Sequence, residues 1–306
     1  MNPIIFSTET NPYYNVATEY QLFKKNTGGI TLFLWQNEPS VFIGRNQNLY
    51  AECDVNYLEE NHIYPVRRFS GGGAVYQDMG NLNFSFICPA DKADIQQFKE
   101  YLYSAMKYLG FSCTYSGRND LLINDRKFSG HAYYEEDNHF LYHGTLLYDV
   151  DLKQLEVALT PSKLKLNSKG ISSVKSRVIN LKELNPTLTL AHIHEALMKA
   201  FPGTLLPMPD STSFPDITSM VKVLQSPSWI YGQAPAWNIT LEHRFSFGLV
   251  TVNAEVKDGK IFDIHFFTDS LLPVHFSLCR QLLLGRWYSE TEIIDVINQN
   301  MVSWRE

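Results

Sequence analysis

The chain has 306 residues, of which 44% are hydrophobic and 19% are charged, and its formal net charge is −6. This composition excludes a disordered chain and a protein that binds nucleic acid over its whole surface, and the length favours two folding units. The acidic balance still allows a local anion site, because local charge and net charge are different quantities.

The start of the chain and the cysteines indicate the cellular setting. Met1–Glu9 lacks the basic and apolar regions of a secretory signal, and no apolar run reaches membrane-spanning length. Cys53, Cys88, Cys113 and Cys279 lie far apart and form no CxxC pair, which argues against structural zinc and a disulfide framework. We therefore expect a soluble cytoplasmic protein with free thiols.

The first third of the chain alternates strand patterns with one amphipathic helix. Thr31–Trp35 and Val41–Ile43 are short apolar runs, and Asn81–Cys88 has the pattern of a buried strand. Apolar residues at helical spacing predict a helix over residues 92–109, which Gly110 ends.

Residues 111–150 have a β-rich pattern. A short strand is expected at Leu121–Ile123, followed by a turn at Asn124-Asp125, and a hairpin is expected around Asp137-Asn138. A second amphipathic helix is expected over residues 189–201.

Residues 207–235 are rich in proline and serine, which is typical of a domain boundary or a surface connection. We therefore expect a large unit of residues 1–237 and a small α/β unit of residues 241–306.

The small unit has its own pattern. Arg244–Val256 and Lys260–Phe267 are strand-like runs joined by a turn that contains Asp258-Gly259, a strong hairpin signal. Two helices are expected to follow, around residues 273–285 and 289–299.

Three segments carry residues suited to chemistry, and the first is RRFSGGGAVYQD, which begins at Arg67. Three consecutive glycines let the backbone approach a ligand, and successive N–H groups in such a loop can bind an anion. Arg67 and Arg68 add donors that suit phosphate or carboxylate. The loop is neither a Walker loop nor a dinucleotide-binding GxGxxG motif, and taken alone it is more often a plain turn.

The second segment, GRNDLLINDRKFSGHA, places Lys127 between a turn and a strand, close to the small residues Ser129 and Gly130. A lysine ammonium can bridge a carboxylate and a phosphate. For a single lysine, a solvated turn is the more common role.

The third segment, YHGTLL, has His143 at the start of an apolar strand. This histidine could line a pocket or transfer a proton, and a core histidine bonded to the backbone fits equally well.

Further along, a run of basic residues without an acid fits either a solvated surface or a strip that faces an acidic partner or phosphate; it comprises Lys163, Lys165, Lys169, Lys175, Arg177 and Lys182. His192 and His194 are two residues apart on a predicted helix, so they do not share a face and do not indicate a metal site.

The three segments together, continued by PSKLKLNSKGISSVKSRVINL, resemble the bacterial lipoate–protein ligases of the biotin/lipoate ligase superfamily. The resemblance extends through Tyr231–Trp237 and Phe266–Ser270, and therefore covers nearly the whole chain. It implies an α/β (α+β) catalytic domain with mixed β-sheets, plus the small C-terminal α/β accessory domain of the long forms, which is expected to shift during the cycle.

The resemblance also implies an activity. A ligase of this family activates free lipoic acid with ATP and Mg²⁺ to lipoyl-AMP. It then transfers the lipoyl group to a lysine of an apo lipoyl carrier, either the E2 subunits of 2-oxoacid dehydrogenases or the glycine cleavage H protein. No nucleic acid or membrane partner is implied, and we expect a monomer.

Site residues follow from the same resemblance. Arg68 is expected to face the ligand phosphate or carboxylate, Lys127 to act catalytically on the lipoyl carbonyl and the α-phosphate, and His143 to line the lipoyl pocket. The residues implied to bind ATP and lipoyl-AMP are Arg68, Gly71, Gly72, Gly73, Ala74, Val75, Tyr76, Asn81, Asp120 and Lys127. Asp120 is also a candidate magnesium contact. Two positions depart from the family pattern: Gln77 stands where His is usual, and His131 where a small polar residue is common.

The reaction suits these residues. A carboxylate needs activation before it forms an amide, and Lys127, Arg68 and the loop N–H groups can hold two mutually repelling anions together. Magnesium would neutralise the departing pyrophosphate. No protein nucleophile is required.

Sequence features argue against three alternative functions. Octanoyl- and lipoyl-transferases of the superfamily use a cysteine, but no cysteine follows Lys127 before Cys279. The GRGRxGR-like loop of biotin–protein ligases is absent from the sequence. A lipoate-binding protein without turnover would not need Arg68 and Lys127. The sequence leaves open both the carrier and the preference between lipoate and octanoate.

Overall fold

The computed structural model describes residues 2–26, 28–116, 119–159, 177–209, 214, 216–231, 239–257, 259–271 and 276–300. The strands are β1 (Pro3–Phe6), β2 (Thr31–Trp35), β3 (Ser40–Ile43), β4 (Tyr64–Arg67), β5 (Val75–Gln77), β6 (Asn81–Pro89), β7 (Thr114–Ser116), β8 (Asp120–Ile123), β9 (Arg126–Glu136), β10 (His139–Leu147), β11 (Thr204–Leu206), β12 (Ile239–Phe245), β13 (Gly248–Lys257) and β14 (Lys260–Thr268).

The helices are α1 (Pro12–Lys25), α2 (Leu49–Glu52), α3 (Val55–Glu60), the 3₁₀ turn η1 (Ala90–Lys92), α4 (Ile95–Tyr108), α5 (Leu152–Ala158), α8 (Leu181–Leu184), α9 (Leu190–Ala200), α10 (Ile217–Gln225), α11 (Pro227–Ile230), α12 (Phe276–Leu283) and α13 (Glu290–Gln299). None of these helices combines the length and apolar composition of a membrane span.

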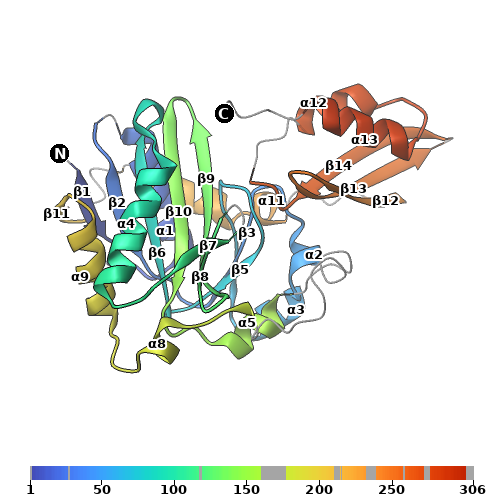
Figure 1. The fold of residues 1–306 in the computed structure, drawn as a ribbon. Helices are drawn as coiled ribbons and strands as arrows, with labels where there is room; N and C mark the ends of the chain where they lie inside the picture. The colour runs from blue at the N-terminus through green and yellow to red at the C-terminus, as the bar shows by residue number, and fades with distance from the viewer. Residues whose placement is uncertain are drawn as a thin grey trace.

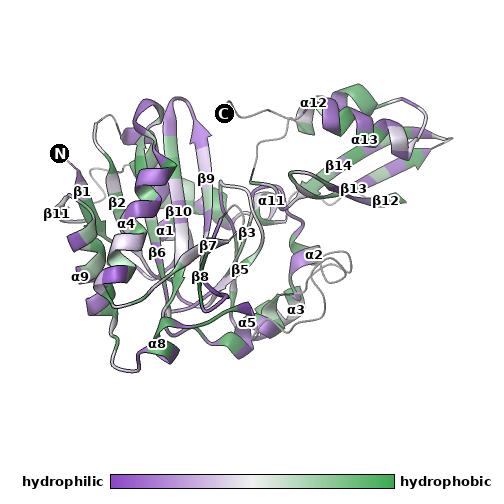
Figure 2. Ribbon diagram, in the orientation of Figure 1, coloured by the Kyte–Doolittle hydropathy of each residue, from purple (hydrophilic) through white to green (hydrophobic). Residues whose placement is uncertain are grey.

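A mixed eight-stranded sheet forms the centre of the large unit, in the order β11-β1-β2-β6-β10-β9-β8-β7. Its inner strands are buried on both faces: every residue of β2, and all of β6 except Pro89, is buried. Helices α4 and α9 pack together over one face, and one core cluster contains their apolar residues. Helix α1 contributes to a second cluster with the small sheet β4-β3-β5. Figure 1 shows the helices on both sides of the strands, and Figure 2 shows that hydrophilic and hydrophobic residues are mixed along these helices.

Local sequence signals explain most of these elements. Helix α4 begins after Asp94, whose side chain accepts from Gln97 N, and ends before Gly110, which has φ of +82°. Both residues of the Asn124-Asp125 and Asp137-Asn138 pairs have positive φ, as two-residue hairpin turns require. The predicted strands and helices of residues 31–201 are thus confirmed, with ends that shift by a few residues.

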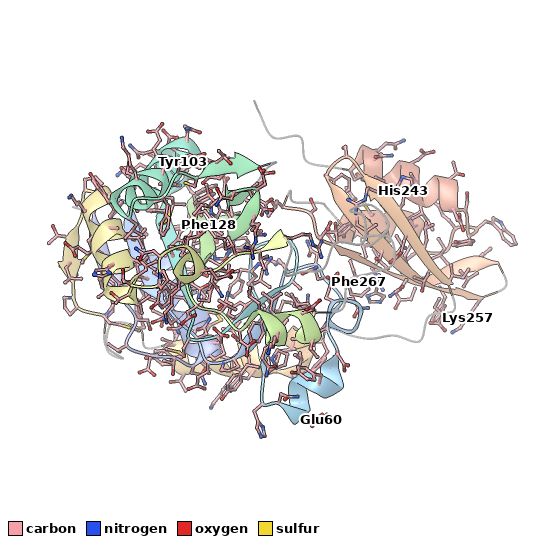
Figure 3. All side chains as sticks on the ribbon, turned by 60° about the horizontal axis from the view of Figure 1, so that its bottom comes forward. Glu60, Tyr103, Phe128, His243, Lys257 and Phe267 are labelled. Atoms are coloured by element: carbon pink, nitrogen blue, oxygen red, sulfur yellow. The ribbon has the colours of Figure 1, made fainter. Side chains whose placement is uncertain are left out.

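A second, smaller sheet lies in the C-terminal part of the chain. Strands β12, β13 and β14 are antiparallel and pack on α12 and α13 around a separate core cluster. Figure 3 labels Lys257 at the outer end of the β13–β14 hairpin and Phe267 at the end nearer the large unit. The predicted hairpin and both helices are confirmed.

Two expectations need correction. Arg244–Val256 is not one strand, because a turn at Ser246-Phe247 separates β12 from β13. The described part of the proline-rich segment is not a surface connection, since it contains α10 packed on α1 and α11 packed on β4.

Candidate active site

A pocket is lined both by the large sheet and by residues of the glycine loop, which we define as Ser70–Ala74. Val16, Trp35 and Phe42 supply apolar surface, whereas Lys127 supplies a cation. The pocket therefore suits an amphiphilic anion.

Lys127 owes its position to the β8–β9 hairpin. The register of the two strands shifts between Leu121 and Leu122, so that Leu122 pairs with Lys127. Such irregularities re-aim a side chain. Lys127 Nζ lies 2.8 Å from Asp120 Oδ1, and a Cβ on Gly130 would lie 2.7 Å from that nitrogen. The absence of a side chain at Gly130 therefore gives the ammonium room beside β9, and the lysine side chain is 31% exposed.

Arg68 is bonded to the glycine loop itself. Its Nη2 donates to the carbonyls of Gly71 (2.6 Å) and Gly73 (2.8 Å), Nε donates to Ser70 Oγ (3.1 Å), and Nη1 donates to Phe42 O (3.2 Å). Burial lowers the pKa of Arg68 to about 10, an effect that the nearby Glu19 opposes. The guanidinium remains charged near neutral pH, and its hydrogen bonds to the Gly71 and Gly73 carbonyls hold the glycine loop in a curled conformation.

The side chain of the neighbouring Arg67 points away from the pocket. Its guanidinium donates to the carbonyls of Arg45 (2.8 Å), Gln47 (2.7 Å) and Trp229 (2.8 Å). Burial lowers its pKa to about 10. Arg67 does not line the pocket; it joins the segment after β3 to α11.

His143 is part of a buried hydrogen-bonded chain that ends at Arg68. Its Nε2 lies 2.7 Å from Ser70 Oγ, and its Nδ1 lies 2.9 Å from Glu19 Oε1. Because Arg68 donates to Ser70, the serine hydroxyl is free to donate to Nε2, and Nδ1–H then donates to Glu19. Ser85 also donates to Glu19, at 2.5 Å. This arrangement links a buried acid to the glycine loop.

His131 lies on β9 in a different environment. Its Nδ1 is 2.6 Å from Tyr142 Oη, and its Nε2 is 2.8 Å from Ser129 Oγ. It pairs with Gly144 across the sheet, where a Cβ would lie 2.7 Å from the imidazole. Burial, followed by the charge of Lys127, lowers the pKa of His131 to about 3. The ring is therefore neutral beside the pocket lysine.

The C-terminal part of the chain contacts the glycine loop directly. Gly72 has φ of +93°, and its N–H donates to the carbonyl of Ser270 at 2.9 Å. A Cβ on Gly71 would lie 2.2 Å from the same carbonyl oxygen. One N–H of the proposed anion-binding loop is thus already bonded to the segment after β14.

The sequence-derived residues divide into two groups. Those that line the pocket are Arg68, Gly72, Gly73, Ala74, Val75, Lys127 and His143. Those outside the lining are Gly71, Tyr76, Asn81 and Asp120. Asp120 reaches the site through its ion pair with Lys127, and Asn81 donates to the lining residue Asn83 at 3.2 Å.

Other lining residues were not identified as site residues from the sequence: Val16, Glu19, Trp35, Phe42, Asn83, Asn119, Gly130, Ala132, Gly144 and Thr145. Gln77 and His131, noted only as departures from the family pattern, also line the pocket. The basic run from Lys163 to Lys175 lies outside the described residues.

The described parts of the chain place no thiol in the pocket lining and contain no metal-binding cluster. Cys53, Cys88 and Cys279 are buried and Cys113 is half-buried, and none of the four lines the pocket. Burial raises the pKa of Cys88 to about 12 and that of Cys113 to about 11. Within those same parts, no three His, Cys, Asp or Glu side chains form a group able to hold a metal.

Comparisons with known proteins agree with the fold. Residues 11–202 match the lipoyl protein ligase A/B catalytic domain, and residues 234–304 match the bacterial lipoate protein ligase C-terminus. A lipoate-protein ligase A of Psychrobacter cryohalolentis is 34% identical over 304 residues, which cover 95% of this chain and 90% of that protein.

Solved structures give the same result. P. falciparum LipL1, crystallised in complex with lipoate, superposes with a TM-score of 0.82 at 28% identity, covering 99% of this chain and 96% of that one. A lipoate-protein ligase A bound with ATP shares the fold, with a TM-score of 0.66 at 21% identity over 76% of this chain and 100% of that one.

Fold and site together define an α/β enzyme class in which an apolar pocket adjoins a lysine and a glycine loop held by arginine. The chain belongs to the lipoyl protein ligase A/B family and carries that family's bacterial C-terminal domain.

Proposed function

We propose that this protein is a lipoate–protein ligase, which activates free lipoate with ATP and joins it to a lysine of an apo lipoyl carrier. The observation that carries the proposal is that Lys127 and the loop held by Arg68 line one pocket whose remaining wall is largely apolar. The family match and the lipoate complex of LipL1 support the choice of acid.

In the first step, a lipoate carboxylate oxygen attacks the α-phosphorus of ATP, and the bond to pyrophosphate breaks. The lipoate carboxylate competes with Asp120 for the ammonium group of Lys127. It can displace Asp120 because that acid is half-exposed and water can solvate it instead. An ammonium beside both anions offsets their repulsion and holds them in attack geometry. Arg68 acts through the loop that it shapes, and its remaining donor capacity is available to the ligand.

In the second step, the carrier lysine amine attacks the lipoyl carbonyl, the bond to AMP breaks, and the amine loses a proton. His143 would line the acyl part of the pocket, held there by Glu19 and Ser70. Neither step needs a protein nucleophile.

Magnesium would be bound mainly through the phosphates of ATP, with Asp120 as the acid closest to Lys127. One carboxylate fits the usual pattern, in which Mg²⁺ keeps several waters and takes one or two protein ligands beside substrate phosphates. When bound, the ion neutralises charge on the departing pyrophosphate.

We further propose a division into a catalytic domain (1–237) and an accessory domain (241–306), a monomeric state and a cytoplasmic location. The separate core clusters of the two parts support the division. The proposed carriers are E2 lipoyl domains or the glycine cleavage H protein.

A thiol-dependent acyl transferase is the main alternative. The positions of the four cysteines outside the pocket lining argue against it. A binding protein without turnover would not require ATP, so nucleotide dependence separates it from a ligase.

The test is lipoate-dependent ATP–pyrophosphate exchange with magnesium. We expect exchange by the wild type and a loss of roughly 10²- to 10³-fold in Lys127→Ala, the range for removing one donor that stabilises developing charge. Lys24→Ala is the matched control, because Lys24 is also paired with an acid (Glu136, 3.0 Å) but does not line the pocket. A folded wild type without exchange would refute the proposal.

A further inference from the structure

Five side-chain amides form a buried chain that leads into the pocket. Asn15 Nδ2 donates to Asn37 Oδ1 (2.9 Å), and Asn37 Nδ2 donates to Gln77 Oε1 (2.7 Å). From the other side, Asn81 donates to Asn83 Oδ1 (3.2 Å), and Asn83 Nδ2 donates to Gln77 Oε1 (3.0 Å). Gln77 is therefore the amide on which both halves of the chain converge.

Backbone carbonyls set the direction of this chain. Asn15 Nδ2 also donates to the carbonyls of Glu9 (3.0 Å) and Gln36 (2.9 Å), which only accept. Asn37 must then turn its oxygen to Asn15 and its nitrogen to Gln77. Gln77 in turn must present its oxygen to Asn37, so its orientation follows from the network.

The consequence is a fixed donor inside the pocket. Gln77 is 3% exposed and lines the pocket, and its Oε1 is occupied by two donors. No acceptor from the described residues is hydrogen-bonded to its Nε2. A ligand that covers this donor removes it from water, so the ligand binds better when it offers a lone pair as the acceptor.

The strand order separates this donor from Lys127. Gln77 bonds to Asn83 on β6, whereas Lys127 is on β9, and β10 lies between these two strands. Two strand spacings correspond to about 10 Å. An extended medium-chain acyl group spans a similar distance, so a carboxylate at Lys127 places the tail near Gln77, Trp35 and Val16.

We propose that Gln77 is a specificity-determining residue whose Nε2–H donates to a sulfur of the dithiolane ring, so that the site favours lipoate over octanoate. This inference rests on the proposed ligase function. Octanoate has the same chain length but a plain hydrocarbon tail that leaves the donor unmet. Sites that hydrogen-bond a substrate reject analogues without the partner atom more strongly than purely apolar sites do. Because sulfur is a weak acceptor, the effect is smaller than for a hydroxyl.

The first test compares kcat/KM for lipoate and for octanoate in pyrophosphate exchange by the wild type and Gln77→Met. We expect the lipoate-to-octanoate ratio to fall roughly tenfold in the variant. An unchanged ratio, with both substrates affected equally, would overturn the proposal and leave Gln77 a structural residue.

A second variant, Asn37→Asp, acts on Gln77 without altering the pocket lining. Asn37 is buried and does not line the pocket. The new carboxylate only accepts, so the Gln77 amide is expected to turn and present Oε1 to the ligand. The side-chain amides of Asn83 and Asn81 can flip together with that of Gln77. Flipping Asn81 breaks no hydrogen bond of its Oδ1, because this buried oxygen has no partner among the described residues. We expect the ratio to fall in the same direction, and an unchanged ratio in this folded variant would refute the orientation argument.

Failure of the ligase proposal has a separate signature, because the wild type would then show no exchange with either acid. Calorimetric binding of lipoate and octanoate to the same three proteins would still test the role of Gln77. Equal affinity of the wild type for the two acids would contradict it.

Discussion

The two walls of the pocket hold their positive charges in different ways. On the loop wall, Arg68 is 8% exposed and donates to the carbonyls of its own loop. On the β9 wall, the Lys127 side chain is 31% exposed and forms an ion pair with Asp120. The difference shows that one cation builds the site and the other is offered to the ligand, although a ligand-binding role was assigned to both from the sequence.

This comparison is tested most strongly by exchanging the arginine. Arg68→Lys should lower the free energy of unfolding by about 3 kcal/mol, because an ammonium cannot reach all the carbonyls that the guanidinium bonds, and some are left buried without a donor. Urea denaturation measures the change. Lys127→Met is the control and should lose under about 1 kcal/mol, since half-exposed ion pairs contribute little. Equal losses in the two variants would remove the distinction between the walls.

The two walls also differ in their histidines. His143 has an acid, Glu19, within 2.9 Å, whereas the side-chain partners of His131 among the described residues are hydroxyl groups. His131 has its pKa lowered from 6.5 to about 3. Below pH 6.5 the imidazole of the unfolded chain is protonated, whereas that of the folded protein stays neutral down to about pH 3. The free energy of unfolding therefore decreases as the pH is lowered between these two values.

At pH 5 the loss from His131 alone should approach about 2 kcal/mol, from 1.36 kcal/mol for each pH unit below 6.5. Denaturation at pH 7.5 and pH 5 should show a smaller loss in His131→Gln than in the wild type. The same loss in both proteins would mean that the imidazole accepts a proton in the folded state.

The availability of Lys127 can be tested without removing it. A Cβ on Gly130 would lie 2.7 Å from Nζ and 2.8 Å from Cε, and this flexible end of the side chain can move aside. Gly130→Ala should therefore reduce pyrophosphate exchange about tenfold, as expected for a displaced charge contact, with little change in stability. Gly28→Ala is the matched control, since a Cβ there meets nothing within 4 Å. Full activity in Gly130→Ala would show that the ammonium does not work from this position.

How far the sequence predicts this site depends on the range of each interaction. Turn residues such as Asn124-Asp125 act locally, so the hairpin that carries Lys127 could be predicted. Glu19 could not, because its partner His143 is 124 residues away and no helix was predicted over α1 (Pro12–Lys25), on which Glu19 lies. The binding of Arg68 to its own loop depends on the curl at Gly72, which a run of three glycines permits but does not specify.

The prediction of strand ends is limited in the same way, because the ends depend on pairing with other strands. The apolar alternation on either side of Ser246-Phe247 is continuous, so Arg244–Val256 reads as one strand until the pairing of β12 with β13 is seen. Gln77 is the clearest case in the pocket. The sequence shows that Gln77 departs from the family pattern. The orientation of its side-chain amide, however, depends on hydrogen bonds from Asn37 and Asn83, which only the fold brings close to Gln77.

The smallest expected effect comes from the thiols, and it tests the premise that these two walls suffice for acyl transfer. None of the four cysteines lines the pocket, and burial raises the pKa of Cys113 and Cys279 to about 11, so these thiols stay protonated at neutral pH. Replacing all four with alanine should leave exchange and lipoyl transfer within about twofold of the wild type, while the buried sites lose some packing. Intact-mass measurement with lipoate and ATP should detect no thioester in the wild type. Loss of transfer in a folded single variant, or a thioester on any cysteine, would show that neither wall completes the reaction without a thiol.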